Sequence, residues 1–338
     1  MLPPSLYFMV GISGSGKSTI AGDLSNALNI KVISSDAIRY EIYGDENIQD
    51  NPQRVFNILH KRVKEELKNG RSVIYDATNL SMKRRVAFLK EIKNIYCEKI
   101  CIIVNTPFSE CVLRNELRER TVPYDVLIKQ REAFQCPYFY EGWDKILITN
   151  TDMGNLSVLE DTLKYLVSVE HNNSHHTLTI GEHMIKAKEY CIKKSAKYFT
   201  LASKKTRSME EVEQLQKEAD QWGEVALAAL YHDIGKAATK TFRNKKGEPT
   251  EEAHYYNHQN VSAYTILSNL SYSSKVFGDA ALDNEYNVLY WLKITVLVQW
   301  HMEHYLRKDK AWEKFANLIG EELVELLDKL HEADKAAH

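Results

Sequence analysis

The sequence predicts two domains, an α/β domain with a parallel sheet and flanking helices over residues 1–169 and an all-α domain over residues 170–338. Three observations support this prediction. Short β-branched runs alternate with helical patterns over residues 5–150, which is typical of a sheet with helices on both faces. After residue 170 long helical patterns dominate, and we find no convincing alternating strand. A chain of 338 residues is also long enough for two domains with separate cores.

The strands of the first domain are predicted from five short apolar runs. Helical patterns lie between them, and "PQRVFNILHKRVKEELKNG" is the clearest because apolar residues recur at every fourth position from Val55 to Leu67. Gly70 suits the end of that helix, and Ser81 is a candidate N-cap for the helical pattern "SMKRRVAFLKEIKN". The predicted strands span residues 5–10, 31–34, 72–77, 99–104 and 145–149.

The second half is expected to be helical. The pattern over residues 155–168 is predicted to close the first domain, and the polar segment "VEHNNSHHT" that follows suits a linker. The segment "RNKKGEPTEEAHYY", residues 243–256, is predicted to be a charged loop. Of the 12 histidines, 11 lie after residue 170, so the composition changes together with the predicted fold. The predicted helices span residues 181–199, 208–238, 258–270, 286–306 and 311–336.

Composition narrows the classes of function. A formal net charge of −2 does not mark a strongly basic nucleic-acid binder, although a local basic patch would still hold a phosphate backbone. The five cysteines are odd in number and scattered, which favours thiols in a reducing compartment over a disulfide framework. Because no leader pattern is present and no apolar run approaches the ~18 residues that span a bilayer, we expect no membrane association. We expect a cytoplasmic protein, in the host cytoplasm if a phage encodes it.

The stretch "GISGSGKST" fits the phosphate-binding loop pattern and lies where that loop requires, after an apolar strand and before a helix. Its glycines allow backbone N–H groups to turn toward phosphates, and the helix N-terminus adds its positive end. Lys17 is expected to reach the β- and γ-phosphates of ATP, and Ser18 is expected to bind Mg²⁺. The predicted nucleotide-binding residues are Gly11, Ser13, Gly14, Ser15, Gly16, Lys17, Ser18 and Thr19.

Polar residues follow several predicted strands and helices of the first domain. Asp36 and Arg39 follow the second strand, where a carboxylate can accept the proton of an attacking hydroxyl and an arginine can grip an acceptor phosphate. The structural alternative is that Asp36 is an N-cap and Arg39 lies on a solvated face. Asp76 ends the third strand, where a carboxylate suits the metal or its waters. The segment "RNELRERTVP" supplies arginines for a lid over the transferring phosphoryl group, or else is an ordinary charged helix face.

Most of residues 5–150 resemble the 5′-hydroxyl polynucleotide kinases of nucleic-acid end healing, including the bacteriophage type. The resemblance lies in the phosphate loop, the Asp36–Arg39 pair, "DATN" and the arginine segment. The resemblance implies a P-loop kinase-like domain in which Asp36 is the general base toward the 5′-hydroxyl and Arg39 holds the neighbouring phosphate. It also implies that Arg114 and Arg118 are lid arginines. Because the lid is one residue shorter than the phage pattern, Arg118 and Arg120 compete for the main role. Related P-loop kinases act on sugars, nucleosides or UDP-sugars.

The second half carries histidines and carboxylates on several apolar helical patterns. "YHDIGK" places His232 and Asp233 side by side near the end of one pattern, and the remaining candidates come from segments far apart in the sequence. A single histidine on an apolar helix is usually a core residue, but several of them with two carboxylates favour a metal site. The mixed nitrogen and oxygen set suits Zn, Mn, Fe, Ni or Co. The candidate ligands are His183, His232, Asp233, His258, His301 and Asp334.

Residues 176–336 resemble the HD-domain phosphohydrolases, particularly the HD modules that accompany RNA-processing enzymes. The resemblance lies in the order of His183, the adjacent pair His232-Asp233 and Asp334, with "GK" shortly after the pair. The resemblance implies metal-assisted hydrolysis in which Asp233 is catalytic and Lys236 contacts a phosphate. It also implies two groups of ligands: His183, His232, Asp233 and Asp334 for one metal, and His258 and His301 where the ligands of a second metal often lie.

The two resemblances together predict a bifunctional RNA or DNA end-healing enzyme. It would join an ATP- and Mg²⁺-dependent 5′-hydroxyl polynucleotide kinase to a transition-metal-dependent 3′-phosphatase or 2′,3′-cyclic phosphodiesterase. Its partners would be nucleic-acid ends, RNA more than DNA, with an RNA ligase acting downstream. Two alternatives stay open. One is a nucleoside or sugar kinase with a nucleotide-hydrolysing HD domain, which the acidic net charge mildly favours, and the other is an ATP-sensing regulatory HD protein.

Overall fold

The computed structural model describes residues 3–48, 50–149, 157–174, 177–204, 207–270 and 282–338. Contacts divide the chain into two compact units, one formed by residues 1–154 and 272–284 and the other by residues 155–271 and 285–338. Among the described residues, no helix combines the length and the apolar character that crossing a membrane requires.

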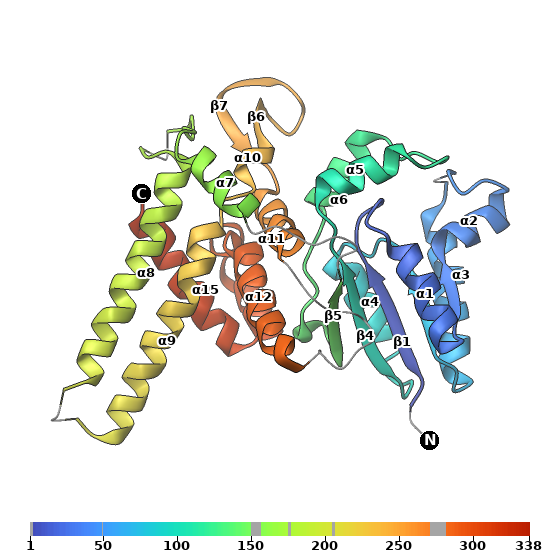
Figure 1. Ribbon diagram of the computed structural model, residues 1–338, viewed down its shortest axis with the longest axis horizontal. Helices are drawn as coiled ribbons and strands as arrows, with labels where there is room; N and C mark the ends of the chain where they lie inside the picture. The colour runs from blue at the N-terminus through green and yellow to red at the C-terminus, as the bar shows by residue number, and fades with distance from the viewer. Residues whose placement is uncertain (1–2, 49, 150–156, 175–176, 205–206, 271–281) are drawn as a thin grey trace. The chain divides into compact units, whose positions relative to one another are not determined.

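The first unit contains a parallel five-stranded sheet with the strand order β2–β3–β1–β4–β5 (Figure 1). Strand β1 pairs with β3 on one side and with β4 on the other, so it lies at the centre of the sheet. Met9, Ile74 and Ile102 from these three strands are buried in one cluster with Ala21 and Leu24 of the helix that follows β1. The prediction of an α/β domain is confirmed. The strands are β1 (Ser5–Val10), β2 (Lys31–Ser34), β3 (Val73–Asp76), β4 (Glu98–Val104) and β5 (Lys145–Thr149).

The helices of the first unit follow the apolar periodicity of the sequence. The residues that recur at every fourth position from Val55 to Leu67 are all buried, and they form the inner face of α3. Gly70 follows this helix with a φ of +72°, a left-handed conformation that commonly ends helices, and Ser81 lies at the N-cap of α4. The helices are α1 (Lys17–Leu28), α2 (Ser35–Tyr43), α3 (Pro52–Lys68), α4 (Met82–Glu91), α5 (Phe108–Glu116) and α6 (Tyr124–Glu132), with a 3₁₀ turn, η1, at Phe139–Glu141.

A buried ion pair joins α4 to η1. Arg85 donates from Nη2 and Nε to the two carboxylate oxygens of Glu141, at 2.6 and 2.8 Å. Its Nη1 donates to the carbonyl oxygens of Asn79 and Leu80, which precede α4. Both charged side chains are fully buried, so the loss of either one would leave the other charge buried without its partner and destabilise the fold.

The second unit is mainly helical, as predicted. Its two longest helices, α8 and α9, lie side by side (Figure 1), and each begins with a capping box: Thr179 with Glu182, and Ser208 with Glu211. The helices are α7 (Ser157–Leu166), α8 (Ile180–Ala202), α9 (Met209–Tyr231), α10 (Lys236–Thr239), α11 (His258–Asn269), α12 (Leu282–Trp300), α13 (Glu303–Leu306), α14 (Asp309–Ile319) and α15 (Glu321–Ala336).

An antiparallel hairpin lies where the sequence predicted only a charged loop. The expectation that no strand follows residue 170 is therefore wrong. The hairpin was missed because its strands are largely exposed and charged, and within the second strand only Ala253 is buried. The side-chain oxygen of Asn244 holds the turn by accepting from the N–H groups of Lys246 and Glu248. The strands are β6 (Lys240–Arg243) and β7 (Pro249–Tyr255).

Helix α9 ends at Tyr231, whereas the sequence predicted a helix that continues to residue 238. Where the chain turns after this helix, α11 approaches Gly235 closely. A Cβ atom on Gly235 would lie 2.3 Å from the carbonyl oxygen of His258 and 2.6 Å from the backbone nitrogen of Ser262. The N–H of Gly235 donates to Ser262 Oγ at 2.8 Å, which fixes the turn to α11.

Helix α7 lies in the second unit by its contacts. Leu159 and Leu166 are buried in one apolar cluster with Ile180 and Met184 of α8. The contact-based division therefore falls before α7, and the domain boundary that the sequence places between residues 169 and 170 stays a prediction.

Candidate functional site

The predicted phosphate loop connects β1 to α1. Backbone crowding explains two of its glycines, because a Cβ on Gly11 would lie 2.5 Å from Val104 O and one on Gly14 would lie 2.2 Å from Cys111 O. Gly14 and Gly16 have φ values of +84° and +93°, which residues with side chains rarely adopt. The glycines are therefore needed for the path of the loop itself.

Lys17 and Ser18 open α1 and lie near the end of β3. Lys17 is buried, and its Nζ donates to the carbonyl oxygen of Ile12 at 2.7 Å. Burial lowers the pKa of Lys17, although the carboxylate of Asp76 opposes this shift. Ser18 Oγ donates to Asp76 Oδ2 at 3.0 Å, and burial raises the pKa of Asp76. The two predicted magnesium ligands, Ser18 and Asp76, therefore lie together.

Asp36 lies between two arginines. Arg39 Nη1 is 2.6 Å from Asp36 Oδ1, and Arg120 Nη1 is 3.2 Å from Asp36 Oδ2. Arg120 also pairs with Glu46 at 3.0 Å. The N-cap of α2 is Ser34, not Asp36, and Arg39 is buried, so the structure does not have the capping aspartate and solvated arginine of the structural alternative.

A cavity of about 600 Å³ brings most of the predicted kinase residues together. Arg118 and Arg120 line it from the segment between α5 and α6, whereas Arg114 lies within α5 and is not among the lining residues that the structure describes. Of the predicted loop residues, Gly11, Ser15 and Thr19 do not line the described cavity. The predicted residues that do are Ser13, Gly14, Gly16, Lys17, Ser18, Asp36, Arg39, Asp76, Arg118 and Arg120.

Gln130 and Thr106 contact the loop and were not predicted. Gln130 Oε1 accepts from the N–H of Ser13 at 2.7 Å, and Thr106 Oγ1 donates to Ser15 O at 2.8 Å. Neither residue has a signal in the sequence, because Gln130 lies in a short charged helix and Thr106 follows β4 without a motif. A phosphate that accepts from the N–H of Ser13 must compete with Gln130.

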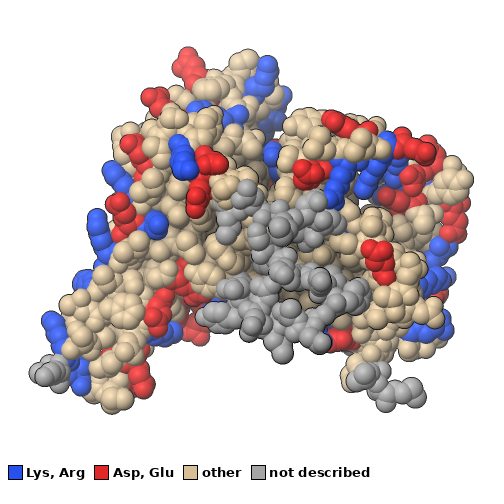
Figure 2. Space-filling model, viewed as in Figure 1, with Lys and Arg blue, Asp and Glu red and all other residues tan. Residues whose placement is uncertain are grey.

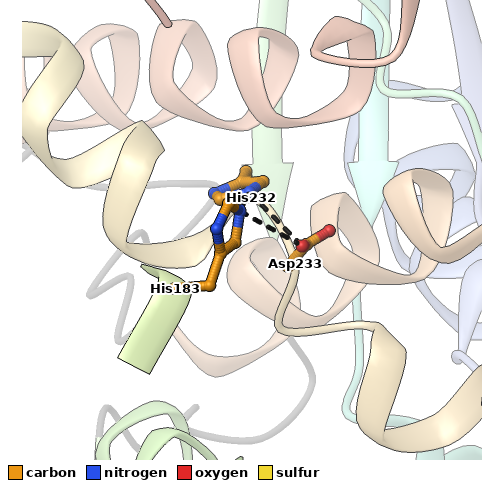
Figure 3. A group of neighbouring side chains, drawn as sticks. All are labelled: His183, His232 and Asp233. Carbon is orange, nitrogen blue, oxygen red and sulfur yellow. Dashed lines mark hydrogen bonds and ion pairs between the residues drawn. The ribbon is translucent and has the colours of Figure 1, made fainter. Parts of the chain in front are cut away.

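The second unit brings the six predicted metal ligands into one buried cluster. His183, in the first turn of α8, places its Nε2 2.9 Å from Asp334 Oδ1 and 3.2 Å from His232 Nε2. Asp233 Oδ2 lies 3.3 Å from His232 Nε2 (Figure 3). Ligand atoms of His183, His232 and Asp233 all lie within 4.8 Å of one another, close enough for one metal ion.

Asp233 also faces a second group of ligands. Its Oδ1 lies 3.1 Å from His258 Nε2 and 3.7 Å from His301 Nε2, and these two nitrogens are 3.2 Å apart. The three residues form a second candidate metal group. Because each carboxylate oxygen faces a different group, Asp233 would be a ligand in both if each group held a metal ion.

The hydrogen bonds of the imidazole rings fit metal binding. In His232, His258 and His301, Nδ1 lies 2.6–2.8 Å from the backbone carbonyl oxygen three residues earlier, so Nδ1 carries the hydrogen and donates it. In a neutral ring of this kind, Nε2 presents its lone pair to the cluster. When both rings are neutral in this way, the Nε2 lone pairs of His258 and His301 face each other. A cation between the two nitrogen atoms would stabilise this pair of rings. The donor set therefore fits divalent metal ions.

Charges within the cluster shift the pKa values of its histidines in opposite directions. Burial lowers the pKa of His232, but Asp233 and Asp334 outweigh it and raise the pKa to about 10. Burial, together with the neighbouring imidazoles, lowers the pKa of His301 to about 3. Burial would raise the pKa of Asp233, but its cationic neighbours hold it well below the ordinary range. The cluster therefore attracts positive charge, which a proton on His232 or a metal ion supplies.

Lys236 and Tyr305 contact the carboxylates of the cluster. Lys236 Nζ is buried, 2.6 Å from Asp233 Oδ2 and 5.2 Å from the ring centre of Tyr255. The phosphate contact expected of Lys236 stays a prediction. Tyr305 was not predicted, because an isolated tyrosine in "MEHYLRK" gives no signal, and its hydroxyl donates to Asp334 Oδ2 at 2.9 Å.

Three other histidines of the second unit make contacts outside the cluster. The rings of His304 and His331 stack at a centroid distance of 4.5 Å, and His304 Nε2 lies 3.0 Å from Asp328 Oδ1. The ring of His254 stacks on Tyr256 at 5.3 Å. Within the described part of the chain, none of the three belongs to either candidate metal group.

Comparisons with known protein families agree with the two-domain architecture. Residues 6–137 match a family model described as an AAA domain, and residues 206–333 match a family model described as an HD domain. The chain therefore combines a P-loop domain of kinase fold with an HD domain, as the sequence predicted. No curated protein matches the chain.

Several solved structures resemble part of the chain. A chain of the Pnkp1/Rnl/Hen1 RNA repair complex is 25% identical, with a TM-score of 0.34, and the match covers 38% of this chain and 43% of that one. A fungal RNA kinase is 13% identical, with a TM-score of 0.32 and coverage of 65% and 98%. A gluconokinase from Sinorhizobium meliloti 1021 is 19% identical, with a TM-score of 0.32 and coverage of 44% and 83%. Because these likenesses are low, we base the functional inference on the chain's own residues.

Proposed function

We propose that this protein, which joins a P-loop domain to an HD domain, heals broken nucleic-acid ends with two active sites. One site would transfer phosphate from ATP to a 5′-hydroxyl, and the other would remove phosphate from a 3′-phosphate or 2′,3′-cyclic phosphate end. The observation that carries the proposal is the position of Asp36 between Arg39 and Arg120, in the cavity that Lys17 also lines.

In the first site Asp36 is the proton acceptor. Its carboxylate takes the hydrogen of the 5′-hydroxyl while that oxygen attacks the γ-phosphorus of ATP and the bond from this phosphorus to ADP breaks. Arg39 is buried beside Asp36 and orients its carboxylate. An arginine next to the base also favours an acceptor that carries its own phosphate, which a nucleic-acid end does and a free sugar does not.

The remaining cations of the cavity act on the transferred phosphoryl group. Lys17 is placed at the phosphate loop, and Arg120 lines the same cavity from the segment between α5 and α6, with a side chain that is 26% exposed. During transfer Arg120 exchanges its contact with Asp36 for the equatorial oxygens of the phosphoryl group, where negative charge develops. Ser18 and Asp76 lie together where Mg²⁺ bound to the nucleotide would be held.

In the second site the buried histidines and carboxylates would hold divalent ions. When bound, such ions lower the pKa of a coordinated water and polarise a phosphoryl oxygen. Imidazole-rich donors favour a transition metal such as Mn, Ni, Co, Zn or Fe over Mg²⁺. Lys236 supplies the buried ammonium group nearest to Asp233 and is the residue that we assign to the substrate phosphate.

The two products define the class of reaction that follows. A 5′-phosphate and a 3′-hydroxyl are the ends that a nucleic-acid ligase joins, so a ligase reaction would consume them. A 2′,3′-cyclic phosphate requires a 2′-hydroxyl, which makes RNA the expected substrate.

Phosphate transfer from labelled ATP tests the kinase assignment. A 5′-hydroxyl oligonucleotide should be labelled in preference to nucleosides and sugars, and Lys17→Ala and Asp36→Asn should each abolish the transfer. Asp36→Asn should still bind ATP, and Asp23→Asn, which changes an exposed carboxylate on α1, is the matched control. Labelling of a nucleoside or sugar alone would replace the proposal with a small-molecule kinase, and ATP binding without any transfer would favour an ATP sensor.

A further inference from the structure

A groove on the second unit adjoins the metal cluster. It has a volume of about 720 Å³ and is lined by the β6–β7 hairpin, the start of α11, and Met302 and Leu306 at the two ends of α13. Five of its lining residues carry the inference: Arg243, Lys245, Tyr255, Tyr256 and His258.

The lining of the groove is positively charged. Arg243 and Lys245 line it, and no acidic residue does so in the part of the chain that the structure describes. Within that part neither cation pairs with a carboxylate, and Arg243 Nη1 donates to Gly247 O at 2.8 Å. Figure 2 shows acidic as well as basic side chains over the top of the hairpin, so the positive charge belongs to the groove and not to the hairpin as a whole. The groove therefore suits an anionic ligand.

Aromatic rings lie beside these two cations. The ring of Tyr256 stacks on His254 with an interplanar angle of 13°. Lys245 Nζ lies 5.6 Å from the centre of the Tyr256 ring. The hydroxyl of Tyr255 donates to His171 O at 2.6 Å, which anchors the second ring. Rings held in place next to cations are the surface on which proteins stack the bases of single strands.

The groove reaches the second group of candidate metal ligands. His258 lines the groove, and its Nε2 lies 3.1 Å from Asp233 Oδ1. A ligand that occupies the groove is therefore next to the cluster to which we assign phosphate hydrolysis. Anion-binding and base-stacking groups at this position serve the part of a substrate that adjoins the reacting phosphate.

We propose that the groove binds the single-stranded nucleotides that precede the terminal phosphate of the substrate. Lys245 and Arg243 contact backbone phosphates, and Tyr256 stacks on a base. This proposal rests on the proposed hydrolase function and specifies its substrate class as oligonucleotides. A mononucleotide has no preceding backbone phosphate for Lys245 or Arg243 to contact, so the groove selects for a strand.

Lys245 and Lys246 form a matched pair for a kinetic test. They are adjacent and exposed on the hairpin turn, but only Lys245 lines the groove. Lys245→Ala should raise KM for a 3′-phosphate oligonucleotide about tenfold and weaken its dependence on salt, because one phosphate contact is lost. Lys246→Ala should leave this KM near the wild-type value and should hydrolyse p-nitrophenyl phosphate, which is too small to reach along the groove, at the wild-type rate. Equal effects of the two substitutions, or no effect of Lys245→Ala, would overturn the proposal.

Photocrosslinking tests the groove without requiring turnover. A single-stranded oligonucleotide with a 3′-phosphate and a 5-iodouridine at its penultimate position is irradiated with the full chain, and the crosslinked residues are identified by mass spectrometry. We expect crosslinks at Tyr255 or Tyr256, and crosslinks confined to other parts of the chain would contradict the groove. Failure to hydrolyse p-nitrophenyl phosphate with any divalent ion would instead remove the proposed hydrolase function, while the crosslink would still decide whether the groove binds a strand.

Discussion

Arg120 Nη1 lies 3.2 Å from Asp36 Oδ2, although the two residues are 84 positions apart in the sequence. The sequence did not decide whether Arg118 or Arg120 is the main lid arginine. Both line the cavity, but in the described structure only Arg120 contacts the proposed base. This contact places Arg120 on the acceptor side of the phosphate loop and makes it the arginine that we assign to the lid.

Arg120→Ala should lower kcat for 5′-phosphate transfer by a factor on the order of 10³, with a small change in KM for ATP, because a lid arginine acts on charge that develops in the transition state. Arg118→Ala should have a smaller effect on kcat. Steady-state kinetics with labelled ATP and a 5′-hydroxyl oligonucleotide measure both variants. A larger loss in Arg118→Ala than in Arg120→Ala would reverse the assignment.

Asp233→Ala should remove metal from both candidate groups, because Asp233 is the residue that they share. His301→Ala should affect only the second group and retain about half of the wild-type metal content. Metal content is measured by mass spectrometry after loading with Mn²⁺ and dialysis, and His304→Ala is the control because His304 lies outside both groups. Kinase activity should persist in all three variants. The same metal loss in His304→Ala as in Asp233→Ala would contradict a shared ligand.

Metal affinity should increase with pH. In the metal-free protein the carboxylates hold the pKa of His232 at about 10, so this residue carries at neutral pH a proton that a metal ion must displace. Calorimetric titrations at pH 7 in buffers of different ionisation enthalpy should therefore report the release of about one proton for each ion bound at the first group. Binding without proton release would show that His232 is neutral before the metal arrives.

The same pKa shift sets the sign of the pH dependence of stability in the metal-free protein. Because the folded pKa of His232, about 10, exceeds the ordinary value of 6.5, its contribution is fully present below pH 6.5 and is lost as the pH rises toward 10. Thermal unfolding of the metal-free protein should show this decrease, and Asp233→Ala, which lacks the adjacent carboxylate, should show less of it.

Arg85→Ala should destabilise the first unit by ~3–5 kcal/mol, because it leaves Glu141 buried without its partner. Arg84→Ala removes an exposed arginine one position earlier in α4 and should change the free energy of unfolding by no more than ~0.5 kcal/mol. Urea unfolding compares the two variants. Replacing both Arg85 and Glu141 by leucine should recover only part of the loss, because the donor to Asn79 O and Leu80 O and the acceptor for Trp143 Nε1 are also removed. Similar losses for Arg85→Ala and Arg84→Ala would contradict a structural role for the buried pair.

The sequence predicted the features that depend on local patterns. The five strands are short β-branched runs, and the inner face of α3 follows directly from a four-residue repeat. The phosphate loop could be placed because its glycines, lysine and serine are contiguous. The candidate metal ligands could be proposed because histidines and aspartates are unusual on apolar helices.

The features that the sequence did not predict depend on contacts between distant segments. The β6–β7 hairpin has exposed, charged strands and so lacks the alternation that marks a half-buried strand. Gln130 at the phosphate loop, Tyr305 at Asp334 and the pairing of Lys236 with Asp233 follow from how helices pack, and no short motif encodes them.

The most direct test of the proposed function uses one RNA oligonucleotide that carries a 5′-hydroxyl and a 2′,3′-cyclic phosphate. The RNA is incubated with the full chain, ATP, Mg²⁺ and Mn²⁺, and mass spectrometry reads both ends. We predict a product with a 5′-phosphate and a 3′ end from which the phosphate has been removed, with Asp36→Asn losing only the first change and Asp233→Ala losing only the second. Unchanged RNA ends, together with phosphorylation of a nucleoside or sugar and hydrolysis of a free nucleotide by the same preparation, would contradict end healing.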